Sequence, residues 1–237
     1  MDFYYLILVI PAIAFSGLVG IMFKSTLAKY SKVASQKGLT GQQTAVQMLQ
    51  LFNINDVPVG PVKGTWSDHY ARGKMKDGTI TKRIGLSEPV FGQNSISAIA
   101  VAAHEVGHAI QYEQKYALIM LRSKIRPIAN FGSKFGPWLA GAGVAFGLEG
   151  VGVVLLDIGI ILFAGAVLLS LLTLPSELNA SSRALAILRD NNMLDQSELK
   201  GAKKALNAAA MTYFAGLLTN FASFLRLLLL RKSRKRK

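Results

Sequence analysis

Residues 104–108 read His104-Glu105-Val106-Gly107-His108, and this pentapeptide decides how the rest of the chain is interpreted. The chain has only three histidines, and two of them stand here, four positions apart. On an α-helix that spacing places both imidazoles on one face, one turn apart, where they can share a metal ion. Glu105 between them can act on a water held by that metal. The motif therefore indicates a hydrolytic zinc site.

The surrounding residues predict a helix over about 97–113. Ser95 and Ser97 are suitable N-caps, and residues 98–103 are strong helix formers. The alternative is an ordinary core helix whose histidines bond to the backbone. That alternative is disfavoured, because it would bury polar side chains on an otherwise apolar helix without giving them a function.

Composition indicates a membrane protein. Of 237 residues, 51% are hydrophobic and only 17% are charged. There is no cysteine, so a zinc site must use His, Asp or Glu ligands. The formal net charge is +14, but the basic residues cluster beside apolar segments and no nucleic-acid-binding signature accompanies them. Nucleic acid is therefore not an expected partner.

Apolar stretches predict the membrane segments. Residues 3–23 read as an uncleaved transmembrane anchor, because Asp2 precedes them in place of the basic residues of a signal peptide. Residues 137–174, interrupted near Glu149, predict a transmembrane hairpin, although Asp157 is unfavourable inside a bilayer. Five glycines would allow its helices to approach closely: Gly141, Gly143, Gly147, Gly159 and Gly165. A last stretch, 208–230, precedes the basic tail 231–237.

The charge pattern predicts an orientation but contains a conflict. Four lysines follow the first span (Lys24, Lys29, Lys32 and Lys37), which predicts an external N-terminus and a cytoplasmic soluble part at 24–136. A full crossing by 208–230 would then place the most basic stretch outside. We therefore expect that 208–230 does not fully cross, but lies in the interface or packs on the catalytic helices, with the tail on anionic lipid. The alternative is four spans, with the site on either face.

The soluble part is expected to hold a small β element. Thr40–Phe52 reads as a capped amphipathic helix, and Val57–Trp66 and Thr79–Leu86 read as short strands. Metallopeptidases often pair an extended substrate with an edge strand. Thr79–Leu86, which precedes the zinc helix, is the candidate edge strand.

A third zinc ligand can be sought by elimination. Acidic residues in turns and helix starts are explained by solvation, which leaves Glu177, His69 and Asp68 as candidates. Ser176 can N-cap a helix that runs to about Arg189, and Glu177 would project from the first turn of that helix. This helix belongs to a third-ligand region at 175–207. Two histidines and a glutamate are a known catalytic zinc set. The alternative for Glu177 is that it only complements the helix dipole.

Five stretches resemble the bacterial membrane-bound neutral zinc metallopeptidases of the YugP-like family. The resemblance covers nearly the whole chain and is clearest at these stretches: His104–Gln111, Gly132-Ser133, Leu174–Ala184, Ala208–Tyr213 and Asp68-His69-Tyr70. That family is similar to the wider gluzincin group, which includes HtpX-like proteases and takes its third ligand from a Glu-x-x-Ala-Asp/Ser motif. The chain departs from the family at Leu178, where an aromatic is usual, and at Ala71-Arg72-Gly73, where a proline turn is usual.

The resemblance implies a mainly α membrane protein with a gluzincin-like domain, a small β element and transmembrane helices, as one domain over 1–237. It implies that Glu177 is the third ligand and that Ser181 holds His104. The expected bacterial location is the plasma membrane, with the active site on the cytoplasmic side. Expected partners are a peptide or membrane-protein substrate and the lipid bilayer. Formation of a homo-oligomer is left open.

The expected activity is that of a zinc endopeptidase with one Zn²⁺ per chain, held by His104, His108 and Glu177. Glu105 would act as general base. His69 and Tyr213 are candidate donors to the oxyanion, and their alternatives are a solvated loop residue and a core aromatic. The main competing function is a non-catalytic zinc-binding membrane scaffold or assembly factor, for which Glu105 would be superfluous. A transporter is a weaker alternative, since only Asp157 suggests an intramembrane charge.

Overall fold

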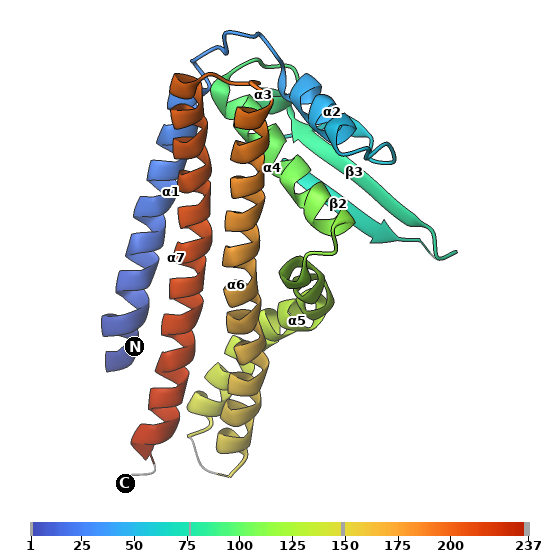
Figure 1. Cartoon of the computed structure of the whole chain (residues 1–237). Helices are drawn as coiled ribbons and strands as arrows, with labels where there is room; N and C mark the ends of the chain where they lie inside the picture. The colour runs from blue at the N-terminus through green and yellow to red at the C-terminus, as the bar shows by residue number, and fades with distance from the viewer. Residues whose placement is uncertain (1, 76, 148–149, 235–237) are drawn as a thin grey trace. The chain divides into compact units, whose positions relative to one another are not determined.

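The computed structural model describes residues 2–75, 77–147 and 150–234. Its strands are β1 (Val59–Val62), β2 (His69–Lys74) and β3 (Ile80–Ser87). Its helices (Figure 1) are η1 (Tyr5–Val9, a π-helix), α1 (Ile10–Tyr30), α2 (Gly41–Leu51), α3 (Glu88–Phe91), α4 (Ile96–Glu113), α5 (Ala117–Ala145), α6 (Val151–Asp190) and α7 (Gln196–Arg234). Glu149 and residues 235–237 of the basic tail lie outside the described residues.

The chain folds into two compact units. The helical unit consists of Met1–Ile21, Ala117–Ser176 and Met211–Lys237, and the mixed unit of Met22–Tyr116 and Glu177–Ala210. The mixed unit therefore contains the sheet, the HExxH helix α4 and the end of α6. Whether 1–237 acts as a single domain stays a prediction.

The sheet of the mixed unit has β3 in the centre. β1 pairs with β3 in parallel and β2 pairs with it antiparallel, with His69 opposite Gly85. The prediction that Thr79–Leu86 forms an edge strand is wrong, because both edges of β3 are already paired. β2, which pairs with β3 and lies at an edge of the sheet, was not predicted. Its sequence contains charged residues and glycine and lacks a clear apolar alternation.

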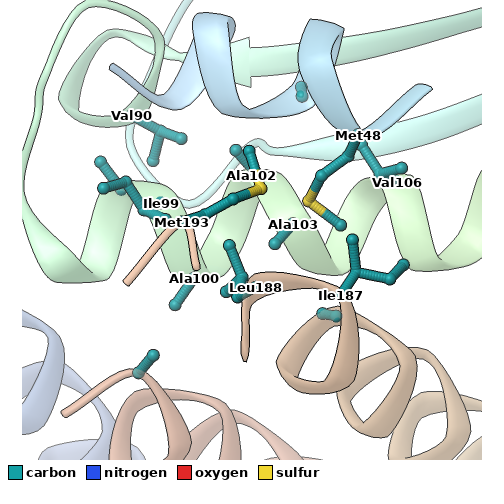
Figure 2. Close-up of a cluster of buried hydrophobic side chains, with 14 of the residues drawn as sticks. Met48, Val90, Ile99, Ala100, Ala102, Ala103, Val106, Ile187, Leu188 and Met193 are labelled. Carbon is teal, nitrogen blue, oxygen red and sulfur yellow. The ribbon is translucent and has the colours of Figure 1, made fainter. Parts of the chain in front are cut away.

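The core of the mixed unit forms around α4. Ser95 caps this helix by accepting a hydrogen bond from the Ala98 amide, so the helix begins at Ile96 and covers the expected 97–113. Figure 2 shows alanines of α4 beside Met48 of α2 and Ile187 and Leu188 of α6. Small side chains on α4 let these neighbouring elements approach closely, which fixes its position in the unit.

In the helical unit, α5 and α6 form an antiparallel pair with close backbone contact. A Cβ added at Gly132 would stand 2.1 Å from the Leu162 carbonyl oxygen, and one at Gly143 would stand 2.5 Å from the Gly152 oxygen. Of the glycines predicted to allow this, Gly143 and Gly159 do so, whereas Gly141 and Gly147 have no neighbour within 4 Å. The pair differs from the expected hairpin, because its first helix begins at Ala117, well before residue 137.

α7 runs antiparallel to α1 within the helical unit. Asp2 pairs with Arg226 at 2.6 Å, the Thr219 hydroxyl lies 3.4 Å from the Ala12 carbonyl oxygen, and Phe15 meets Phe214 edge-on. Residue numbers therefore rise along α1 as they fall along α7. α7 is likewise antiparallel to α6, because Asp157 pairs with Arg231 and Ser170 accepts a hydrogen bond from Asn220.

Three helices of the described part are long and apolar enough to cross a membrane: Tyr5–Tyr30, Val151–Asp190 and Gln196–Ser233. α5 is not among them; its first part carries Arg122, Lys124 and Arg126, and the rest of it is rich in glycine and contains Asn130, Ser133 and Lys134. The predicted fold class, a mainly α membrane protein with a small β element, is confirmed.

The region of the expected third ligand is built differently from the prediction. Glu177 does not lie in the first turn of a helix capped by Ser176, because α6 continues through Pro175 from Val151 to Asp190. The Ser176 hydroxyl donates to the Leu172 carbonyl oxygen within this helix. Proline removes one backbone donor, but neighbouring hydroxyls and packing allow long apolar helices to tolerate it.

Candidate metal centre

α4 and α6 bring three potential ligand side chains together in the mixed unit. His104 and His108 project from one face of α4, with ring centroids 4.7 Å apart and ring planes at 83°. Glu177 of α6 points between them, and its Oε2 lies 3.1 Å from His104 Nε2 and 3.2 Å from His108 Nε2. The ligand atoms of the three residues all lie within 4.8 Å of one another.

These distances fit a zinc ion. In a tetrahedral site with bonds of about 2.0–2.1 Å, ligand atoms stand roughly 3.3–3.4 Å apart. The two observed nitrogen–oxygen distances are close to that value. Two imidazoles and one carboxylate, with no thiolate in the chain, match the His₂Glu set of catalytic zinc sites.

The glycine of the motif sets the distance between the two helices. A Cβ added at Gly107 would stand 2.6 Å from the carbonyl oxygen of Ala180. Only a residue without a side chain allows α6 to approach α4 this closely. Gly107 thereby allows the turn of α6 that carries Glu177 to lie beside the two imidazoles.

His104 is oriented from behind by a hydroxyl. Its Nδ1 lies 3.0 Å from Ser181 Oγ, one helical turn after Glu177 on α6. A hydroxyl can accept the Nδ1–H proton, which leaves the Nε2 electron pair directed at the metal position. The resemblance had assigned Ser181 to this place, and its functional role stays a proposal.

His108 is oriented by a longer chain of hydrogen bonds. Its Nδ1 lies 3.0 Å from Gln111 Oε1, and Gln111 Nε2 donates to Asn179 Oδ1 at 2.9 Å. Arg183 Nε donates to the same Asn179 oxygen at 2.7 Å. Because Arg183 can only donate, the Asn179 atom must be oxygen, the Gln111 amino group must face it, and the Gln111 oxygen must accept from His108.

This chain fixes which nitrogen of His108 is available. With its Nδ1 donating to Gln111, a neutral His108 directs the Nε2 electron pair at the Glu177 carboxylate. An electron pair and a carboxylate oxygen repel unless a cation stands between them. Burial opposes a charge on the imidazole, but Glu177 outweighs it and raises the pKa of His108 above its ordinary value of 6.5. The geometry is therefore satisfied by a positive charge at this point, either a metal ion or the proton of a charged imidazole.

Glu105 lies beside the ligands and is held by the sheet. It is 8% exposed, and its Oε2 accepts a hydrogen bond from the Tyr70 backbone amide of β2 at 2.7 Å. Since this amide points away from β3, β2 presents the polar backbone groups of Tyr70 and Arg72 on its outer edge. The edge strand and the proposed base are therefore directly connected.

His69 lies apart from the ligand cluster. Its ring packs over Gly85, with Nδ1 2.7 Å from the Ser67 carbonyl oxygen and Nε2 3.5 Å from Arg83. The neighbouring Tyr70 ring stacks on Tyr112 of α4, so the His69 ring points to the opposite face of the sheet. The predicted oxyanion role of His69 stays a prediction. Asp68, the other leftover candidate ligand, accepts hydrogen bonds from the amide and hydroxyl of Ser87.

Tyr213 belongs to α7 in the helical unit, whereas the ligand cluster belongs to the mixed unit. Its predicted role as an oxyanion donor stays a prediction. Sequence reasoning missed Gln111 and Asn179 as supporting residues. Gln111 had a usable signal, because a residue three positions after His108 lies on the same helix face.

Comparison with known proteins agrees with a metallopeptidase-like site. The model of a family described as "Putative neutral zinc metallopeptidase" matches residues 5–232. The chain belongs to this family. It is also 42% identical over 227 residues to the "Putative membrane protease YugP" of Bacillus subtilis (strain 168), which covers 95% of this chain and 96% of that protein. No solved structure matches the chain.

Membership of the family confirms the resemblance seen in the sequence. It agrees with the membrane-crossing helices and with a cluster of histidine and glutamate suited to a metal. The chain is thus a membrane protein of a zinc metallopeptidase family.

Proposed function

We propose that the protein is a membrane-bound zinc-dependent endopeptidase that binds one Zn²⁺ through His104, His108 and Glu177. The observation that supports this most strongly is the convergence of these three side chains beside Glu105. A structural zinc site would be expected to have four protein ligands. In the described residues, the metal-ligating group contains three, which leaves one coordination position for chemistry.

A zinc ion in this position would lower the pKa of a water ligand to about 7 and polarise a scissile carbonyl group. Ser181 and Gln111 keep the Nε2 atoms of the two histidines directed at it. Glu177 contributes a negative charge that offsets part of the charge of the cation.

Glu105 moves the proton in this proposal. Its Oε2 is occupied by the Tyr70 amide, so Oε1 is the atom that accepts the proton of the attacking water. The same oxygen then returns the proton to the nitrogen of the leaving amine. The bond to Tyr70 prevents the carboxylate from rotating away between these two steps.

The substrate backbone would pair with β2 rather than with Thr79–Leu86. The outer edge of β2 presents the carbonyl of Tyr70 and both backbone groups of Arg72, and an extended peptide added there lies next to Glu105. His69 and Tyr213 remain proposed oxyanion donors, with His69 the less favoured because its ring packs over Gly85 and its Nδ1 faces the Ser67 carbonyl oxygen.

We further propose that the protein resides in the bacterial plasma membrane with its active site on the cytoplasmic side. The lysines that follow the first span support this side, and a full crossing by α7 would then place the basic tail on the external side. The proposed partners are a peptide or membrane-protein substrate and anionic lipid at the basic tail. A homo-oligomer remains open.

Glu105→Gln and Glu177→Ala, purified in detergent, test the function. Glu105→Gln should retain wild-type zinc content by metal analysis and lose peptide hydrolysis by at least ~100-fold, because it removes the base but no ligand. Glu177→Ala should lose zinc and activity together. Hydrolysis by Glu105→Gln at the wild-type rate would reject the base, and unchanged zinc in Glu177→Ala would reject the third ligand. A zinc-binding wild type that cleaves no peptide in a random library would favour the scaffold alternative.

A further inference from the structure

A mostly apolar pocket of about 200 Å³ lies in the mixed unit, apart from the ligand atoms. This volume is several times the ~30 Å³ share of one water molecule. Its apolar walls come from α1, α3, α4 and the loop before β2, and include Leu27, Trp66, Pro89, Val90 and Val101. None of the residues described so far as ligand or base lines it.

The pocket adjoins the catalytic face of α4. Val101 precedes His104 by three positions and Glu105 by four, and Ser97 lies one further turn away. Helix residues three and four apart stand about 5–6 Å from one another on one face. The face of α4 that carries Glu105 and the imidazoles therefore also carries Val101 and Ser97, which form part of the pocket wall.

The edge strand leads to the same pocket from the other side. Asp68, which lines the pocket, is two residues before Tyr70, whose amide binds Glu105. Two residues of extended chain cover about 6.6 Å. A peptide paired with β2 and crossing Glu105 would thus place a nearby side chain at the pocket mouth.

Trp66 provides an independent sign of function at this pocket. It is 51% exposed, although its ring also contacts Phe23 at 5.2 Å between centroids. Its φ is 63°, a left-handed conformation that is unfavourable for a bulky side chain. Strained backbone of this kind is enriched at ligand-binding and active sites. An exposed, strained aromatic over an apolar cavity is suited to cover a bound side chain.

We propose that this pocket binds one large apolar side chain of the substrate, such as leucine or phenylalanine, and so determines cleavage-site preference. The proposal rests on the proposed peptidase function. The carboxylate of Asp68 at the pocket makes an acidic side chain unfavourable there. Val101 is the residue through which the pocket and the catalytic face meet.

The first experiment measures kcat/KM for quenched fluorescent peptides that differ at one position, which holds leucine, phenylalanine, alanine or aspartate. Val101→Phe should fill the pocket, lowering kcat/KM for the leucine and phenylalanine peptides at least ~10-fold while leaving the alanine peptide within about twofold. Val101→Ala should shift preference toward phenylalanine. The matched control is Val46→Phe on α2, an exposed valine outside the pocket, which should rank the peptides as the wild type does.

The second experiment measures binding without catalysis. The chain has two tryptophans, and Trp138 is 79% exposed, so Trp138→Phe leaves Trp66 as the single reporter. In the Glu105→Gln background, the leucine peptide should change Trp66 fluorescence in a saturable way. Val101→Phe should weaken this binding at least ~10-fold, and Val46→Phe should not.

The outcomes are separable. Saturable binding that depends on Val101, in a protein that cleaves nothing, would keep the pocket and reject the peptidase. Active, zinc-loaded Val101→Phe and Val101→Ala proteins that rank the peptides as the wild type does would overturn the pocket. A Trp66 response to phospholipid vesicles but to no peptide would also overturn it, by identifying an acyl-chain site. Thermal unfolding of Val101→Phe, compared with the wild type and the control, shows whether this variant is folded. If it is not, Val101→Ala still tests the pocket.

Discussion

At the scale of single residues, the direction of hydrogen bonds around His108 determines what the site can bind. Arg183 donates to Asn179, Gln111 donates to the same oxygen, and His108 then donates to Gln111. Because Arg183 can only donate, the donor and the acceptor of each following hydrogen bond are fixed, up to the Nδ1–H of His108. Arg183, on α6, thereby determines that Nε2 of His108 is the nitrogen left to bind a metal.

Gln111→Leu should weaken zinc binding by about 10–100-fold, because it removes the acceptor that orients His108. Gln111→Glu retains an acceptor and should lose less affinity. Competition with a chelator of known zinc affinity measures both. Gln47→Leu, an exposed residue of α2, is the control. Equal zinc affinity in Gln111→Leu and the wild type would show that Gln111 does not position the ligand.

Residue-level prediction from the sequence was strongest where spacing alone determines geometry. The four-residue spacing of His104 and His108 needs only a helix, and Glu177 followed from the short list of carboxylates. Asn179 could not be found in this way, because its role depends on a partner 68 positions away. His69 was singled out for its rarity, yet its ring lies over Gly85 on the outer face of the sheet.

At the scale of elements, the crossing of α4 and α6 in the mixed unit decides whether the third ligand reaches the histidines. Their backbones approach closely at Gly107 and Ala180, one turn from Glu177. The same principle recurs between α5 and α6 in the helical unit, where glycines lie against backbone atoms. Small residues thus determine helix spacing throughout the chain.

Gly107→Ala tests this crossing. Alanine usually stabilises a helix relative to glycine, by about 0.5–1 kcal/mol. Here the new methyl group would press on the Ala180 oxygen, so we expect a net loss of about 1–3 kcal/mol and weaker zinc binding. Thermal unfolding and metal analysis measure the two effects. Gly92→Ala, with open space around the added carbon, should show neither; a stabilised, fully zinc-loaded Gly107→Ala protein would contradict the argument.

Errors at this scale have identifiable physical causes. Ser176 was predicted to cap the start of a helix, but α6 passes through this point and through Pro175 within a long apolar segment. Thr79–Leu86 was assigned to an edge because it precedes the zinc helix, whereas strand order depends on β2, which has no clear strand pattern. Local sequence gives the type of an element more reliably than its neighbours.

At the scale of the whole molecule, the antiparallel course of α1 and α7 in the helical unit bears on membrane topology. Contacts follow α7 from Phe214 to Arg226 beside residues 15 to 2 of the N-terminal segment. A helix that lay in the interface would not run alongside a spanning helix in this way. The expectation that 208–230 stays in the interface remains a prediction, while the length and composition of α7 and its packing along α1 fit the alternative of a full span.

We predict that both chain ends lie on the same side of the membrane. Because the chain has no cysteine, single-cysteine variants report without background. Phe3→Cys and Ser233→Cys should react with an impermeant maleimide from one side, and Lys32→Cys, placed after α1, should react from the other. Labelling of residues 3 and 233 from opposite sides would disprove the arrangement. The side that contains residue 32 also decides whether the soluble part is cytoplasmic.

The two ion pairs of α7 have a consequence for biosynthesis. Asp2 and Asp157 are made well before their partners Arg226 and Arg231, which belong to α7. Until α7 has been made, neither of these two ion pairs can form, although charges beside apolar segments are costly. A ribosome that stops before Arg226 therefore releases a product in which the helical unit lacks both ion pairs.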